Sequence, residues 1–165
     1  MELMHILINK NYLTFSNYKV KCAVGKRGIG YKKEEGDFIT PKGQFKIKFI
    51  LFRKDRIKKI KTDLKSFVIK KEMGWCDDPR SKQYNKLIKS PSEFSYEKLY
   101  RKDNMYDIIL VLNYNMNPTK KKKGSAIFIH IAKRNYKKTA GCIAVGKRDL
   151  INILSKVNKN TKVRI

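Results

Sequence analysis

Two side chains that could carry out nucleophilic chemistry, His130 and Cys142, lie twelve positions apart late in the chain. A thiol with an ordinary pKa is mostly protonated at neutral pH. A neighbouring imidazole and surrounding cations lower that pKa and supply a thiolate nucleophile. Gly141 precedes the cysteine, and without a Cβ it would let a substrate carbonyl approach the backbone N–H groups of an oxyanion hole. The pattern alone leaves open a simpler interpretation, in which both side chains pack in a core.

Two short apolar segments would position these side chains. Residues 125–132 and 141–145 have the apolar character of buried strands, and the basic segment Lys133–Lys138 joins them. Adjacent strands connected by such a loop would bring the imidazole beside the thiol. The sequence therefore predicts a Cys–His pair at the ends of two neighbouring strands.

Most of the remaining chain also has strand patterns. Alternating or apolar runs predict strands over residues 4–9, 12–15, 19–24, 44–52, 66–69, 106–114 and 161–165, the first two forming a hairpin. Residues 147–157 form the one clear amphipathic helix, and residues 25–43 and 74–105 are expected to be loops or irregular. We expect a mostly β (α+β) fold in a single domain over residues 1–165. It would be a mixed β-sheet or sandwich with one C-terminal helix and few short helices.

The charge of the chain is extreme. Its 165 residues include 40 Lys and Arg against 14 Asp and Glu, a formal charge of +26 that favours an anionic partner. Residues 108–165 hold half of this charge. No apolar run approaches the roughly 18 residues of a membrane helix, and the N-terminus resembles a strand more than a signal peptide. The three cysteines and two histidines lack the spacing of a disulfide framework or metal site, so we expect no metal and no cofactor.

Four segments occur in an order that is typical of one enzyme family. His130 is followed by Thr-Ala-Gly-Cys-Ile at residues 139–143, and Thr-Pro-Lys-Gly-Gln-Phe lies much earlier, at residues 40–45. Asn-Tyr-Asn at residues 113–115 precedes the histidine strand, and Gly-Trp-Cys-Asp-Asp-Pro at residues 74–79 is followed by Tyr84-Asn85. Over roughly residues 20–165 the chain resembles the L,D-transpeptidase catalytic domain, the YkuD-like family, in a divergent branch that carries the last segment as an insertion.

This resemblance implies a β-rich domain that transfers acyl groups on peptidoglycan stem peptides. It implies that Cys142 is the nucleophile, that His130 is the general base, and that the backbone carbonyl of Ile131 orients the imidazole. The N–H groups of Gly141 and Cys142 would face the oxyanion. Cys142 would form a thioester with the third stem residue and release D-alanine, and an amine of a second stem would then resolve the thioester.

Further residues are candidate substrate contacts. Tyr114 is a candidate phenol donor, Thr139 belongs to the cysteine motif, and Trp75 and Asp77 lie in the insertion, where the alternative for Trp75 is packing. Many members of the family have Arg where this chain has Ala144. This departure leaves the choice between transfer and hydrolysis open.

Two other functions remain as alternatives. The same fold could act as an L,D-carboxypeptidase, because both reactions share the thioester. A non-enzymatic nucleic-acid-binding protein would use lysines such as those in segments 58–61 and 120–123 as phosphate contacts, but no nucleic-acid-binding motif is present. We expect peptidoglycan stem peptides as partners, no specific nucleic acid, no transmembrane segment and a monomer. The family implies the cell envelope, although the chain shows no signal peptide.

Overall fold

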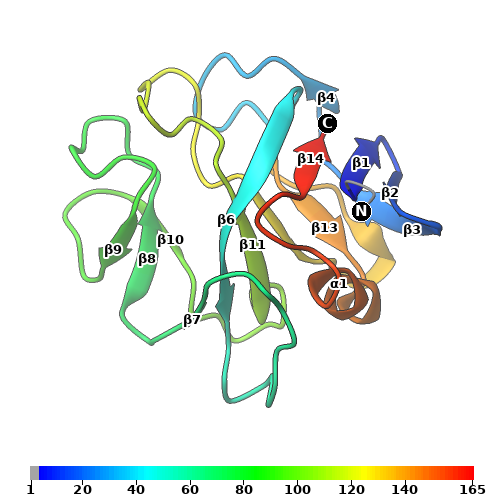
Figure 1. Cartoon of the computed structure of the whole chain (residues 1–165). Helices are drawn as coiled ribbons and strands as arrows, with labels where there is room; N and C mark the ends of the chain where they lie inside the picture. The colour runs from blue at the N-terminus through cyan, green and yellow to red at the C-terminus, as the bar shows by residue number, and fades with distance from the viewer. Residues whose placement is uncertain (1–3) are drawn as a thin grey trace.

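The computed structural model describes residues 4–165, and short β-strands make up most of its regular structure (Figure 1). One α-helix, α1 (Lys147–Leu154), and one 3₁₀ turn, η1 (Arg134–Tyr136), accompany them. The strands are β1 (His5–Asn9), β2 (Tyr12–Phe15), β3 (Tyr18–Ala23), β4 (Ile29–Gly30), β5 (Thr40–Pro41), β6 (Gln44–Phe52), β7 (Ser66–Val68), β8 (Met73–Cys76), β9 (Leu87–Lys89), β10 (Tyr96–Lys98), β11 (Ile108–Leu112), β12 (Phe128–Ile131), β13 (Ile143–Val145) and β14 (Lys162–Arg164).

Nine of the strands form one mixed sheet that closes on itself. The order is β11-β12-β13-β3-β2-β1-β14-β6-β7, and β11 also pairs with β6, so that eight strands complete a ring with β7 attached to β6. The pairs β1–β14, β12–β13 and β6–β7 are parallel, whereas the other pairs are antiparallel. The predicted fold class is confirmed, including the hairpin of β1 and β2.

Strand β11 is apolar throughout because both of its faces are covered. Ile108, Leu110 and Leu112 point into the interior of the ring, and Ile109 and Val111 join a second cluster outside it. Alternate side chains of a strand point to opposite faces, so each face of β11 contributes to a different core. The same alternation places Ile129 and Ile131 of β12 in the ring interior and Phe128 in the outer cluster.

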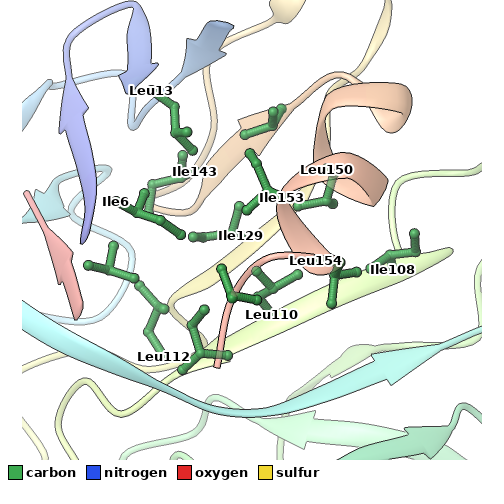
Figure 2. Close-up of a cluster of buried hydrophobic side chains, with 14 of the residues drawn as sticks. Ile6, Leu13, Ile108, Leu110, Leu112, Ile129, Ile143, Leu150, Ile153 and Leu154 are labelled. Atoms are coloured by element: carbon green, nitrogen blue, oxygen red, sulfur yellow. The ribbon is translucent and has the colours of Figure 1, made fainter. Parts of the chain in front are cut away.

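Helix α1 closes one side of the ring interior. Leu150, Ile153 and Leu154 recur at helical spacing and are buried against the sheet, next to Ile108, Leu110 and Ile129 (Figure 2). Asp149 in the first turn is favourably placed for the helix dipole. The helix therefore fixes the strand pair β12–β13 from behind. No helix in the described residues is long and apolar enough to cross a membrane.

The segment expected to be irregular, residues 74–105, contains regular structure. Strands β10, β8 and β9 form a separate three-stranded sheet, in that order. Each is only three or four residues long, which is too short for an alternating pattern to emerge from the sequence. This small sheet places Trp75 and Leu99 in the outer cluster, against Phe128 of β12.

Candidate active site

Strands β12 and β13 bring His130 and Cys142 to one face of the sheet. The two strands are parallel, with His130 opposite Ala144 and Ile129 opposite Ile143. Cys142 lies two positions before Ala144, so its side chain points to the same face as His130, at a Cα separation of roughly 8 Å from strand spacing.

The thiol is held by the segment that leads into β12. Cys142 Sγ donates to the carbonyl of Ala126 at 3.0 Å, and the N–H of Phe128 donates to Cys142 Sγ at 3.4 Å. Ala126 has a positive φ of 53°, a conformation that costs a non-glycine residue energy. This left-handed backbone at Ala126 directs its carbonyl at the thiol of Cys142, a contact that no local sequence pattern predicts.

The imidazole of His130 is buried and has a defined tautomer. Its Nδ1 lies 2.9 Å from the carbonyl oxygen of Ile131. Since a carbonyl can only accept, Nδ1 carries the proton and Nε2 keeps its free lone pair. The ring of Tyr106 packs edge-on against the imidazole at 5.4 Å, and the Tyr106 hydroxyl donates to Glu97 at 3.0 Å. His130 therefore presents a fixed, unprotonated nitrogen.

The expectation of a lowered thiol pKa is wrong for the free protein. Although Cys142 is partly exposed on the cavity wall, burial raises the pKa of its thiol to about 12, and Glu97 and Glu35 add to the rise. The hydrogen bond from the N–H of Phe128 and, after it, the charge of Lys32 lower the pKa, but both effects are smaller than that of burial. Burial also lowers the pKa of His130 to about 4. The pair is thus a neutral thiol and a neutral imidazole, so proton transfer must accompany nucleophilic attack.

The low pKa of His130 predicts a pH-dependent stability. An unfolded histidine titrates near pH 6.5, whereas the folded His130 titrates near 4. Between these values the unfolded chain binds a proton that the native chain does not, so the free energy of unfolding falls as the pH drops from about 6.5 to about 4. The loss amounts to about 3 kcal/mol, and below pH 4 this group adds nothing further.

Urea denaturation at a series of pH values measures this effect. A His130→Asn variant keeps a polar side chain that does not titrate, so the difference in unfolding free energy between wild type and variant should change across this window. Carboxylates that titrate in both proteins change both unfolding free energies equally, so they do not affect the difference. A constant difference from pH 7 to pH 4 would contradict the burial of a neutral imidazole.

Two threonines fix the loop before Cys142 through hydrogen bonds. Thr139 Oγ1 donates to the carbonyl of Cys142 at 2.6 Å and accepts from the N–H of Gly141 at 3.1 Å. Thr40, in β5, donates to the carbonyl of Gly141 at 2.8 Å and accepts from the N–H of Gly25 at 2.8 Å. Gly141 has a φ of 143°, which favours glycine.

These bonds change the expected oxyanion hole. The N–H of Gly141 is already engaged by Thr139, so it is not the free donor that the sequence suggested. The N–H of Cys142 makes no hydrogen bond to any part of the chain from residue 4 onwards. Thr139, predicted as a substrate contact, shapes this loop and also lies on the cavity wall.

A cavity of about 670 Å³ opens over the two candidate catalytic side chains, a volume in the range of ligand sites. Its wall includes both of them, together with Asp77, which accepts from the hydroxyl of Ser95. Of the basic residues near the nucleophile in sequence, Lys133, Lys137 and Lys138 reach the cavity wall. The described residues contain no group of three or more His, Cys, Asp or Glu side chains that could hold a metal ion.

Two predicted substrate contacts lie elsewhere. Tyr114 does not line the cavity; its hydroxyl donates to the carbonyl of Lys123 and its ring packs on Phe45. Trp75 is 2% exposed and packs edge-on against Phe128, behind the candidate site. The prediction that these two side chains contact the substrate directly is wrong. The Tyr114 ring packs on Phe45 and its hydroxyl donates to the carbonyl of Lys123, and the Trp75 ring is buried in the outer cluster. For Trp75 the packing alternative holds.

Asn85 links the small sheet to the candidate site. Its Oδ1 accepts from Trp75 Nε1 and from the N–H of Ala126, both at 3.0 Å. Its Nδ2 donates to the carbonyls of Tyr114 and Asn115. Asn85 is buried, and it positions Ala126, which holds the thiol. The sequence indicated only that this asparagine belongs to the insertion.

Replacing Asn85 by alanine should destabilise the protein by about 3 kcal/mol, because it leaves buried N–H and carbonyl groups without partners. Part of the loss comes from the positive φ of 59° at this position. Asn135→Ala is the matched control, since Asn135 also has a positive φ, of 65°, but is exposed. Urea denaturation should give a loss of about 1 kcal/mol for the control. Equal losses in both variants would exclude a bonding role for Asn85.

The chain matches the model of a known protein family. The family model described as YkuD, L,D-transpeptidase catalytic domain, matches residues 4–165. No curated protein matches the chain. The matched region contains every residue of the candidate site described above.

Proposed function

The chain belongs to the YkuD family of L,D-transpeptidase catalytic domains, and we propose that it is a cysteine acyltransferase acting on peptidoglycan stem peptides. The observation that carries this proposal is the position of Cys142 and His130 on one face of parallel neighbouring strands, at the wall of a common cavity. The carbonyl of Ile131 fixes the tautomer that a general base needs.

The first half of the reaction forms a thioester. Cys142 Sγ attacks the carbonyl of the third stem residue while its proton passes to His130 Nε2. The N–H of Cys142 donates to the oxygen that becomes negative. The tetrahedral intermediate then collapses, the bond to D-alanine breaks, and the imidazolium returns the proton to the departing amine.

The second half transfers the acyl group. An amine of a second stem peptide attacks the thioester and loses a proton to His130, and the imidazolium returns this proton to the departing thiolate of Cys142. Asp77 lies on the cavity wall beside Glu97 in a chain with few acidic residues. We propose that Asp77 attracts the acceptor, which arrives as an ammonium ion and gives up one proton to solvent before its amine attacks, and that holding the acceptor there favours transfer over hydrolysis.

A product analysis tests the proposal. The protein is incubated with a tetrapeptide donor stem and a tripeptide acceptor stem, and the products are identified by mass spectrometry. Release of D-alanine together with a donor–acceptor cross-link supports the transferase. Release of D-alanine with only a trimmed donor supports an L,D-carboxypeptidase instead, and no release of D-alanine rejects both.

The family acts on the cell wall, and we propose that this chain acts in the cell envelope. The formal charge of +26 supports a substrate in the cell wall, since the acidic polymers of the wall attract a cationic protein.

A further inference from the structure

One buried polar side chain on the cavity wall lacks a partner. Ser125 is 5% exposed and lines the cavity, and its Oγ makes no hydrogen bond within residues 4–165. The Tyr84 hydroxyl donates its own proton to Glu35, and the Ser125 hydroxyl lowers the pKa of Tyr84 as a distant hydrogen-bond donor. A buried hydroxyl without a close partner destabilises the free protein, which is typical of a group that binds a ligand.

A buried ammonium group lies beside this serine. The side chain of Lys32 is 3% exposed, and its Nζ is paired with Asp37 and donates to the carbonyl of Ile39 at 3.2 Å. An ammonium group has three protons to donate, and these two contacts use two of them. Lys32 also lines the cavity, so the third proton is available there.

Two glycines make room for Lys32 next to the nucleophile. A Cβ on Gly124, the residue before Ser125, would lie 2.3 Å from Lys32 Cε and 3.3 Å from its Nζ. A Cβ on Gly141, the residue before Cys142, would lie 3.6 Å from the same Nζ. The ammonium group therefore lies between the segments that carry the serine and the cysteine.

The surroundings favour a negatively charged ligand. Six cationic and three anionic side chains line the cavity, the cations being Lys26, Lys32, Arg101, Lys133, Lys137 and Lys138. Of the carboxylates on the wall, Glu35 accepts from the Tyr84 hydroxyl and Glu97 from that of Tyr106. The Ser125 hydroxyl and the Lys32 ammonium group both line the cavity that Cys142 lines. Both can donate a hydrogen bond, and the natural partner of two such donors is a carboxylate.

We propose that Lys32 and Ser125 form a carboxylate-binding corner that holds a side-chain carboxylate of the acyl-donor stem peptide beside Cys142. The assignment rests on the proposed function for the identity of the ligand. The corner makes Ser125 a specificity residue, because it selects donors by the charge of the residue whose carbonyl is attacked.

The test measures binding without acylation. Two synthetic tetrapeptide donors differ only in the third residue, which carries either a free side-chain carboxylate or its carboxamide. Calorimetry gives the Kd of each peptide for the Cys142→Ala protein, for the same protein with Ser125→Ala, and for a control with Ser66→Ala, an exposed serine of β7. Thermal melting of all three proteins accompanies the titrations.

We expect the carboxylate donor to bind roughly tenfold to a hundredfold more tightly than the carboxamide, the range for a hydrogen bond to a charged group. Ser125→Ala should remove most of this preference and leave the melting temperature unchanged or raised, since the hydroxyl has no partner in the free protein. Ser66→Ala should change neither quantity.

Equal Kd values for the two donors, or an equal weakening of both by Ser125→Ala, would overturn the corner. The proposed function is judged separately, from acylation of wild-type Cys142 by the same peptides. A difference in Kd between the two donors without acylation of Cys142 would support the corner and reject the transferase. Acylation of Cys142 with equal Kd values for the two donors would support the transferase and reject the corner.

Discussion

We expect Cys142→Ala to abolish acyl transfer, because it removes the thiol that is proposed to form the covalent acyl intermediate. The loss should be complete within detection, both for D-alanine release from a stem peptide and for covalent capture of a carbapenem. Such a β-lactam presents a strained carbonyl to the same nucleophile. Mass spectrometry of the small-molecule products measures the D-alanine released, and mass spectrometry of the intact protein measures the mass that the carbapenem adds.

The other two cysteines provide the control. Cys22 and Cys76 are both buried, and neither lines the cavity over His130. Burial raises the pKa of Cys22 to about 11, so this thiol is almost fully protonated at neutral pH. Cys22→Ala and Cys76→Ala should retain acylation at Cys142. A carbapenem adduct that persists in Cys142→Ala would remove the cysteine from the mechanism.

Replacing His130 by alanine should slow acylation of Cys142 by a factor of about 10² to 10⁴, the usual contribution of a general base. The effect is large because the thiol, with a pKa of about 12, has almost no thiolate at neutral pH. In the wild type the rate should fall as the pH drops through about 4, where the imidazole becomes protonated. The variant should lose this acid limb, and its rate should rise with pH towards 12.

The pH–rate profile separates a chemical role from a structural one. Added imidazole should restore part of the activity of His130→Ala, because it can enter the space that the side chain leaves. His5→Ala is the control, since the other described histidine lies on β1 and not on the cavity wall. An acid limb near pH 4 in His130→Ala would show that another group acts as the base.

The sequence was informative wherever local pattern determines structure. The strands around His130 and Cys142 have apolar runs that only a doubly covered sheet explains, and the spacing of Leu150, Ile153 and Leu154 identified α1. Strand ends were less well placed: the segment from 125 to 132 yields only Phe128–Ile131 as strand. Its first three residues instead form the turn that holds the thiol.

What the sequence could not show depends on contacts between distant segments. The pKa of Cys142 was predicted to fall from the basic residues near it in the chain, yet burial outweighs them, and the cation that acts on it is Lys32, over a hundred positions away. Asn85 and Ser125 are ordinary polar residues in the sequence. Their roles depend on their surroundings: Asn85 has hydrogen-bond partners for both its amide oxygen and its amide nitrogen, whereas Ser125 Oγ has no close partner in residues 4–165.

The hydrogen bond from Thr40 to the carbonyl of Gly141 joins residues 101 positions apart. A contact of such sequence separation closes a very long loop, and long loops are closed late in folding. The loop that carries the nucleophile therefore takes its working shape only when the first quarter of the chain has docked on the last. The proposed acyl transfer should therefore report complete folding, because a nascent or proteolytically clipped chain would lack the backbone geometry that places Cys142 beside its substrate.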